Sequence, residues 1–135
     1  MLGKLRAKSD RFQDDDSGSA TIESLLWIPM FVFVLVLITD VSFILFGKAQ
    51  ALRFIQDGNR ALSVGALESV EETEEFILAN MAGFSSTATV ETSIVDGIII
   101  STTLVMPAVD LMVIGTMPIF EDTLISVSAN HFLEQ

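Results

Sequence analysis

Residues 25–46 read LLWIPMFVFVLVLITDVSFILF, a run of 22 residues in which Asp40 is the only charged side chain. A helix needs about 20 consecutive apolar residues to cross the hydrocarbon core of a bilayer. The alternative is a buried core helix, but residues 66–135 are too few to surround a helix that is apolar on all sides. We therefore predict a single transmembrane helix in this part of the chain.

The residues on either side of this run indicate its orientation. Four Lys and Arg residues precede it and three follow it, and Lys and Arg near the ends of a membrane helix favour the cytoplasmic side. The preceding residues are also few and polar, whereas those that follow have the pattern of a folded domain. We predict a cytoplasmic N-terminus and a head outside the cytoplasm.

A secretory signal is the other interpretation of this stretch, because residues 49–51 read AQA and fit the small-residue cleavage site of such signals. The apolar region of a signal is about 7 to 15 residues long. The run in this chain is longer, contains Pro29 and is followed by Lys48 just before the candidate site. A membrane anchor is therefore the better match.

The charge of the chain limits its partners. Its net charge is −11, and from Ser19 onward it has fourteen acidic and three basic residues. Such a surface repels nucleic acid and anionic lipid headgroups, since binding to either depends on Lys and Arg. We therefore expect no nucleic-acid partner.

The residue types that carry enzyme chemistry are scarce. The chain has no cysteine and a single histidine, His131, close to the end of the sequence. It has no recognisable triad, metal-binding box or glycine-rich phosphate loop. We predict that the protein is not an enzyme and that it carries no cofactor or metal.

The upstream edge of the apolar run has a second pattern. Residues 14–30 read DDDSGSATIESLLWIPM, so a charged leader ends at Gly18 and Glu23 follows at the fifth position. Glycine leaves the backbone free to adopt an extended conformation in a protease cleft. Cleavage there would create an amine at Ser19, with which the Glu23 carboxylate of the same or a neighbouring subunit can pair. Alternatively, Glu23 is a first-turn acid that lies among the headgroups and interacts favourably with the helix dipole.

This junction resembles the leader of type IV pilins. In that family a prepilin peptidase cuts after the glycine on the cytoplasmic side, and the glutamate five residues later is a hallmark of the mature subunit. The resemblance implies a cut between Gly18 and Ser19. It departs from the family at Ser19, where many type IV pilins carry a phenylalanine that becomes N-methylated.

A narrower resemblance is to TadE-like pseudopilins, the minor pilins of the Tad (tight adherence) system. Glu23 is followed six residues later by Pro29, as in the E-x5-P pattern of these proteins. Residues 46–67, FGKAQALRFIQDGNRALSVGAL, resemble the second stretch of the family, with Arg60 matched to its arginine. The resemblance covers residues 14 to about 66, and the head does not add to it.

The resemblance implies a minor pilin or pseudopilin that acts in the assembly or initiation of a Tad-type pilus. The implied partners are membrane lipid, the prepilin peptidase, other pilins or pseudopilins and the pilus assembly-platform proteins. The implied location is the bacterial cytoplasmic membrane, with a periplasmic head and association with the pilus after processing. The alternative is an uncleaved single-pass anchor whose periplasmic head binds a protein or a small ligand.

Two further residues of the helix are candidates for a role in assembly. Pro29 removes one helix hydrogen bond, which membrane helices tolerate where neighbours satisfy the freed carbonyl. An acid inside a membrane, such as Asp40, is by default a functional hypothesis. With a span that starts near Ile22, Asp40 lies about 27 Å along the helix at 1.5 Å per residue. We therefore favour a position at the far interface, where the cost of the charge is lower.

The sequence after the apolar run predicts an amphipathic stem and a short helix. Apolar residues recur at helical spacing, and Gly58 and Gly65 are candidate weak points, with Gly65 the favoured end. Ser69 and Glu72 form the pattern of a capping box, which opens a helix that continues to about Met81. A calcium site is the alternative reading of the acids at 71–75, but successive helical acids point in different directions.

The remainder of the head predicts strands. Residues 87–95 and 98–105 are rich in β-branched side chains, and Asp96-Gly97 between them is a strong hairpin signal. Residues 124–129 alternate and supply a candidate third strand. The apolar stretch 106–120 either lines the core or forms a docking patch, and we favour the core because the head has few other residues to build one.

Together these patterns predict an α+β, pilin-like fold. A long N-terminal transmembrane and stem helix precedes a small head with a short helix and an antiparallel hairpin or three-stranded sheet. The predicted parts are a cleaved cytoplasmic leader (1–18), the transmembrane helix (19–46), the stem helix (47–65) and the acidic extracytoplasmic head (66–135).

Overall fold

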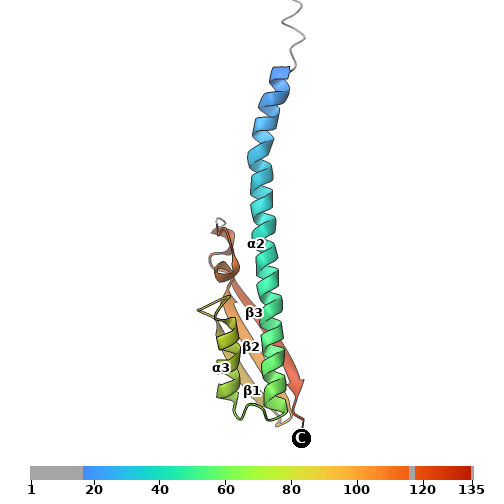
Figure 1. Ribbon diagram of the computed structural model, residues 1–135, viewed down its shortest axis with the longest axis vertical. Coiled ribbons are helices and arrows are strands. Elements are labelled where there is room, and N and C mark those ends of the chain that lie inside the picture. The colour runs from blue at the N-terminus through green and yellow to red at the C-terminus, as the bar shows by residue number, and fades with distance from the viewer. Residues whose placement is uncertain (1–16, 116–117, 135) are drawn as a thin grey trace, which may run out of the picture. The chain divides into compact units, whose positions relative to one another are not determined.

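The computed structural model describes residues 17–115 and 118–134 (Figure 1). It confirms the predicted α+β fold, with a long apolar N-terminal helix, a second short helix and a three-stranded antiparallel sheet. The elements are α2 (Ser17–Ser63), α3 (Val70–Met81), β1 (Thr89–Val95), β2 (Ile99–Pro107), the 3-10 turns η2 (Ala108–Leu111) and η3 (Pro118–Phe120), and β3 (Leu124–Phe132). The predicted leader 1–18 lies outside the described residues except for Ser17 and Gly18.

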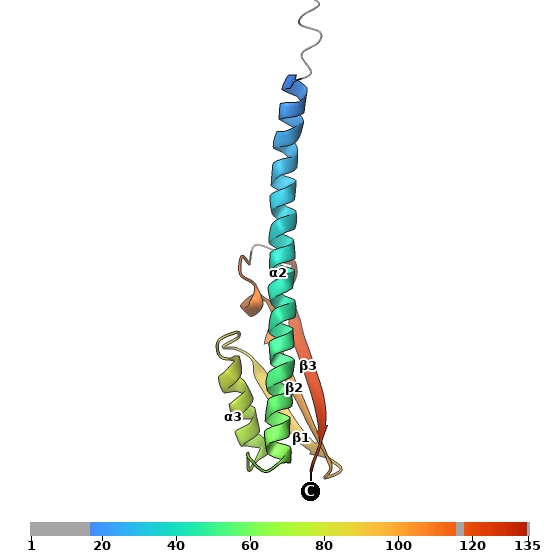
Figure 2. The ribbon, with the colours of Figure 1, turned by 45° about the vertical axis from the view of Figure 1, so that its right-hand side comes forward.

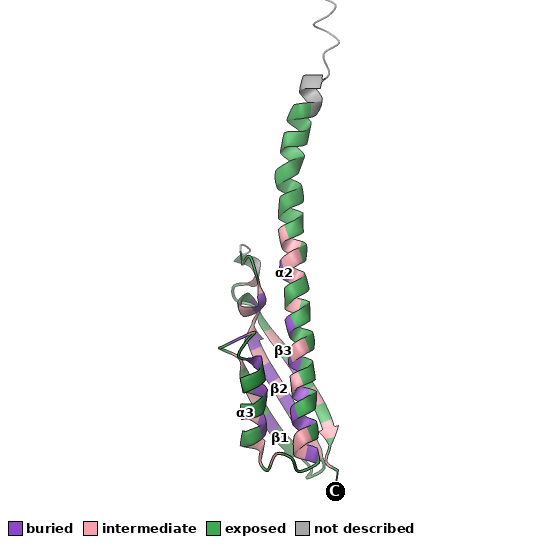
Figure 3. Cartoon of the chain, viewed as in Figure 1, coloured by how far each residue is buried: buried purple, intermediate pink, exposed green. Residues whose placement is uncertain are grey.

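The chain divides into two compact units, Met1–Val36 and Leu37–Gln135. In the first unit every residue from 21 to 35 is exposed (Figure 3). The helix is long and apolar enough to span a membrane, and only 6% of its most apolar 18-residue stretch is buried. It is therefore not the buried core helix of a soluble domain, and it continues through Pro29 without a break.

In the second unit, the sheet has the order β1-β2-β3 with both pairs antiparallel. The predicted hairpin at Asp96-Gly97 is confirmed. Both residues have positive φ angles, 54° and 72°, and the Ile98 N–H donates to the Val95 carbonyl at 3.2 Å. This is the conformation that Asp-Gly favours in tight hairpins. The predicted third strand is also present, and it extends to Phe132.

The core lies between one face of this sheet and the two helices. Residues along β2 alternate between buried and half-buried, so the buried face of the strand presents Ile100, Thr102, Leu104 and Met106. The C-terminal half of α2 and the whole of α3 lie side by side on that face (Figure 1, Figure 2). The buried apolar cluster consists of Ala51, Ile55, Ile77, Met81, Leu104, Met106, Leu111 and Val127.

The ends of the helices are formed by local hydrogen bonds. Gly65, with φ +75°, follows the end of α2, and the Ala66 N–H donates to the Ala61 carbonyl at 2.8 Å. This is the Schellman arrangement for which glycine is suited. Helix α3 starts as its capping pattern predicts, since the Glu72 N–H donates to Ser69 Oγ at 3.1 Å. The Glu72 carboxylate in turn accepts from the Glu68 N–H at 2.7 Å.

Gly58, the other candidate weak point, does not interrupt α2. A Cβ at this position would lie 2.9 Å from Cγ1 of Ile77 on α3. Glycine therefore lets the two helices approach closely, and its lower helix propensity is offset by the contact.

A buried polar network connects α2 to all three strands, and the sequence did not predict it. The Thr102 hydroxyl donates to Asn59 Oδ1 at 2.6 Å, and Asn59 Nδ2 donates to the Ala129 carbonyl at 3.1 Å. The hydroxyls of Thr92 and Thr102 are 3.1 Å apart. Because buried polar groups cost free energy unless they are paired, this network fixes the position of the helix on the sheet.

Candidate functional site

The candidate processing residues lie at the start of α2. Gly18 and Ser19 belong to its first turn, and nothing is described of their side chains. Glu23 follows within the same helix and is exposed. Its carboxylate therefore lies on a helix segment in which most side chains are apolar and exposed.

The other candidate from the family resemblance, Arg60, lies in the last turn of α2 and is exposed. It belongs to the second unit, whereas Glu23 belongs to the first.

Asp40 is fully buried and is held by the head. Its Oδ1 accepts hydrogen bonds from two successive backbone N–H groups, those of Val113 at 3.2 Å and Ile114 at 3.0 Å. Its Oδ2 is buried without a partner among the described residues. The sequence favoured a position at the lipid interface from the distance along the helix alone. The structure adds that this side chain points toward the head, where residues 113 and 114 cover it.

A second contact holds the segment before Val113 against α2, two turns further along the helix from Asp40. Leu111, at the end of η2, is only 6% exposed. A Cβ on Gly47 would lie 2.5 Å from Leu111 Cδ2, so the absence of a side chain creates the space that this leucine fills. Asp40 and Gly47 are seven residues apart and therefore lie on the same face of the helix.

These contacts explain why the head unit begins at Leu37. The sequence assigned residues up to 46 to the transmembrane part, yet the contacts of Asp40 with the 112–115 segment include that part of α2 in the packed head. Within the stretch 106–120, Met106, Ala108 and Leu111 are buried, in agreement with the predicted core role. Val109, Val113 and Ile114 are exposed.

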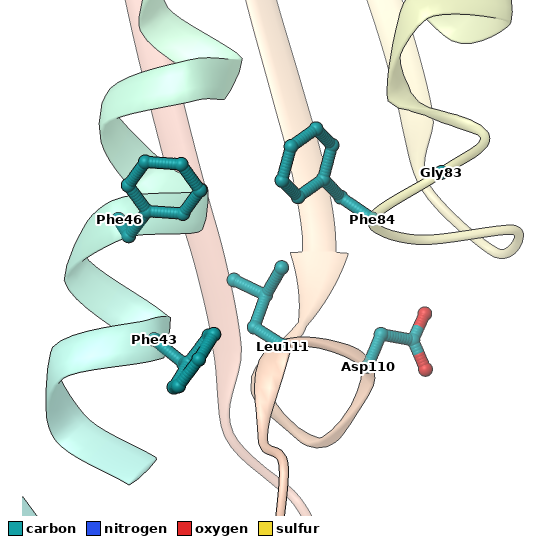
Figure 4. Close-up of a pocket in the computed structure, with 6 residues that line it drawn as sticks. All are labelled: Phe43, Phe46, Gly83, Phe84, Asp110 and Leu111. Atoms are coloured by element: carbon teal, nitrogen blue, oxygen red, sulfur yellow. The ribbon is translucent and has the colours of Figure 1, made fainter. Parts of the chain in front are cut away.

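An apolar pocket of about 250 Å³ lies beside this junction (Figure 4). Its lining residues come from α2, from the turn after α3 and from η2, and they are Phe43, Phe46, Gly83, Phe84, Asp110 and Leu111. The rings of Phe46 and Phe84 are 6.1 Å apart. Asp110 turns away from the phenylalanines (Figure 4) and accepts hydrogen bonds from the hydroxyls of Ser85 and Thr87.

The chemistry available at this junction is that of packing and hydrogen bonding. Its two carboxylates, Asp40 and Asp110, already accept hydrogen bonds from the protein. Among residues 17–115 and 118–134 there is no group of three His, Cys, Asp or Glu side chains that could hold a metal ion. In the acidic helix α3, Glu74 accepts from the Thr92 N–H at 2.6 Å, so it protects the edge of the sheet at β1.

Comparisons with known proteins returned no relative: the chain matches no protein-family model, no curated protein and no solved structure. A functional proposal for this chain therefore depends on its own residues and on their arrangement.

Proposed function

We propose that this chain is a TadE-like pseudopilin, a minor pilin that acts in the assembly or initiation of a Tad-type pilus after cleavage by a prepilin peptidase. The observation that carries the proposal is the continuity of three features in one helix. The Gly18-Ser19 junction and Glu23 open the helix, residues 25–35 are exposed and apolar, and the rest packs into a small α+β head. An exposed apolar helix fixed to a compact head is the organisation that a pilin subunit requires.

In this proposal the exposed part of the helix lies first in the membrane and then in an assembly of subunits. In the membrane, its apolar side chains face lipid, as expected for a span of this length. In an assembly, the same side chains pack against the helices of other pilins. We place the protein in the bacterial cytoplasmic membrane, with its N-terminus in the cytoplasm and its head in the periplasm. Its partners would be the peptidase, other pilins and the assembly-platform proteins.

Glu23 has a physical role in this scheme. A charged carboxylate in a membrane helix costs up to ~3 kcal/mol at the bilayer centre and less near the interface. A free amine on Ser19 after cleavage would pair with a carboxylate and offset that cost. Because Glu23 is exposed, it is available to the amine of a neighbouring subunit, and such a pair would set the stagger between adjacent helices.

The test is the mature N-terminus of the full-length chain produced in a bacterium that has a prepilin peptidase. Intact-mass and N-terminal peptide mass spectrometry should find Ser19 as the first residue. Gly18→Leu should abolish the cut because it fills the bare backbone position, while Gly3→Leu, in the same leader, should leave it unchanged. A mature chain that starts at Met1 would replace the proposal with an uncleaved anchor, and one that starts at Leu52 would indicate a secreted protein.

A further inference from the structure

The 109–114 loop exposes three large apolar side chains within six residues. Val109 is 44% exposed, Val113 60% and Ile114 44%. A single exposed apolar residue is normal on a protein surface, but a cluster of them marks a surface that binds something. The Asp110 carboxylate in the same loop is turned toward the hydroxyls of Ser85 and Thr87.

This loop is fixed to α2 at two points. The Val113 and Ile114 N–H groups donate to Asp40 Oδ1, and Leu111 fills the space left by Gly47. Val113 and Ile114 therefore have a defined position at the level of Asp40, and the start of the loop is held near the level of Gly47.

That level lies inside the apolar run of α2. Asp40 is six residues before the end of the run at Phe46, which is about 9 Å at 1.5 Å per residue. The neighbouring helix residues Ile38 and Phe43 are also exposed, 54% and 45%. Phe43 and the loop therefore both expose apolar side chains near this level, whereas Ile38, two residues from Asp40, lies on the opposite side of the helix.

The hydrogen bonds to Asp40 would satisfy backbone groups of the loop inside the membrane. Backbone N–H groups that enter the apolar part of a membrane have to be satisfied by the protein itself, because water is absent. Asp40 satisfies two of them in the loop, and it is itself covered by the loop. A carboxylate that accepts from the loop backbone therefore lowers the cost of burying these two N–H groups in lipid.

We propose that the 109–114 loop inserts into the interface of the bilayer that α2 crosses, on the side of the head, so that the head makes a second contact with lipid. Apolar groups of interfacial segments penetrate about 5–10 Å below the headgroups, which matches the level of Asp40 in the run. This proposal rests on the transmembrane role of α2 within the proposed function. Lipid is the occupant, and not a second copy of the chain, because Val113 and Ile114 are held at Asp40, inside the apolar run of α2.

The absence of cysteine from the chain makes the test direct. Val113→Cys in the full-length protein is labelled with an environment-sensitive fluorophore and reconstituted into phosphatidylcholine vesicles that contain spin-labelled lipid. Phe31→Cys, on the exposed part of the apolar helix, is the positive control. Ile94→Cys is the negative control, since Ile94 is 43% exposed but lies at the far end of β1 from this loop.

The label at position 113 should shift to shorter wavelength and be quenched by the lipid, as at position 31, whereas the label at 94 should do neither. If 31 is quenched and 113 behaves like 94, the loop proposal is refuted while the membrane anchor stands. If 31 is not quenched either, both are refuted. Quenching at 113 should persist when the protein is diluted in lipid, and its loss on dilution would assign the surface to a second copy of the chain.

A second variant tests the role of the carboxylate. Asp40→Ala should reduce the lipid quenching at 113 without changing that at 31, because the loop loses its attachment. Asp40→Asn should retain it, since the amide oxygen can accept the same two hydrogen bonds. Equal quenching at 113 in the alanine variant and the parent would show that insertion does not depend on Asp40, contrary to the proposal.

Discussion

Replacing Asp40 by alanine tests how firmly the head holds α2. The substitution removes the acceptor of two backbone hydrogen bonds, from Val113 at 3.2 Å and Ile114 at 3.0 Å. A hydrogen bond to a charged group contributes about 1.5–3 kcal/mol. Both distances exceed the roughly 2.7–2.9 Å that is usual for charge-assisted bonds, so we take the lower end, about 1.5 kcal/mol for each. Since ~1.4 kcal/mol corresponds to a factor of ten in an equilibrium constant, each amide should open about ten times more often.

Amide hydrogen exchange of the full-length protein in detergent micelles measures this opening residue by residue. In Asp40→Ala the Val113 and Ile114 amides should exchange about tenfold faster, while amides in the centre of β2 should change little. The matched control is Ser42→Ala, two residues from Asp40. It removes a hydroxyl that donates within α2, to the Ile38 carbonyl, rather than to the loop. Unchanged exchange at 113 and 114 in Asp40→Ala would refute the attachment.

Three other substitutions give distinct outcomes. Gly58→Leu should lower the stability of the head by about 1–3 kcal/mol through overpacking against α3, measured by thermal unfolding, whereas Gly83→Leu, at an open position, should not. Asn59→Ala should cost about 1–3 kcal/mol because it leaves the buried Thr102 hydroxyl and a strand carbonyl with one partner fewer, and a denaturant midpoint equal to that of the parent would contradict this. Glu23→Ala should permit membrane insertion but impair co-purification with partner pilins, and normal incorporation would rule out its pairing role.

Local signals in the sequence were sufficient for the elements of the head. The Asp96-Gly97 turn, the Ser69 cap and the end of α2 at Gly65 each depend on a few neighbouring residues, and the structure confirms all three. Such features can be predicted because the hydrogen bonds and backbone conformations that form them involve only a few consecutive residues. The short helix and the hairpin followed from them directly.

The sequence did not predict which face of α2 packs on the head. Size and hydrophobicity do not identify this face, because Leu45 and Leu52 are 61% and 37% exposed. Ile55 is buried as the spacing predicts, but the other buried positions of this face are taken by small or polar residues, including Gly47, Ala51 and Asn59. In a helix that is apolar on several sides, large side chains do not mark the packed face, because close approach to a sheet favours small ones.

Asp40 shows the same limit for a candidate site residue. The position of Asp40 along the helix predicted its depth in the membrane, but not the side of the helix on which its side chain lies. Asp40 is seven residues from Gly47 and eleven from Ala51, and this spacing places all three on one side of a helix. The partner on that side, the backbone of residues 113 and 114, lies more than seventy residues later in the chain. No local pattern could identify such a partner.

The division of α2 into two faces has a consequence for assembly. Its head-facing stripe is occupied by Asp40, Gly47 and Ala51, so it cannot also contact another subunit. Phe43 and Phe46 lie outside this stripe and remain about half exposed, beyond the residues 21–35 that form the first unit's apolar surface. If α2 packs on other pilins, its contact surface therefore includes these phenylalanines. Substituting Phe43 should change association more than the folding of the head, whereas Phe46 also packs on Phe84 of the head, and substituting the stripe should destabilise the head.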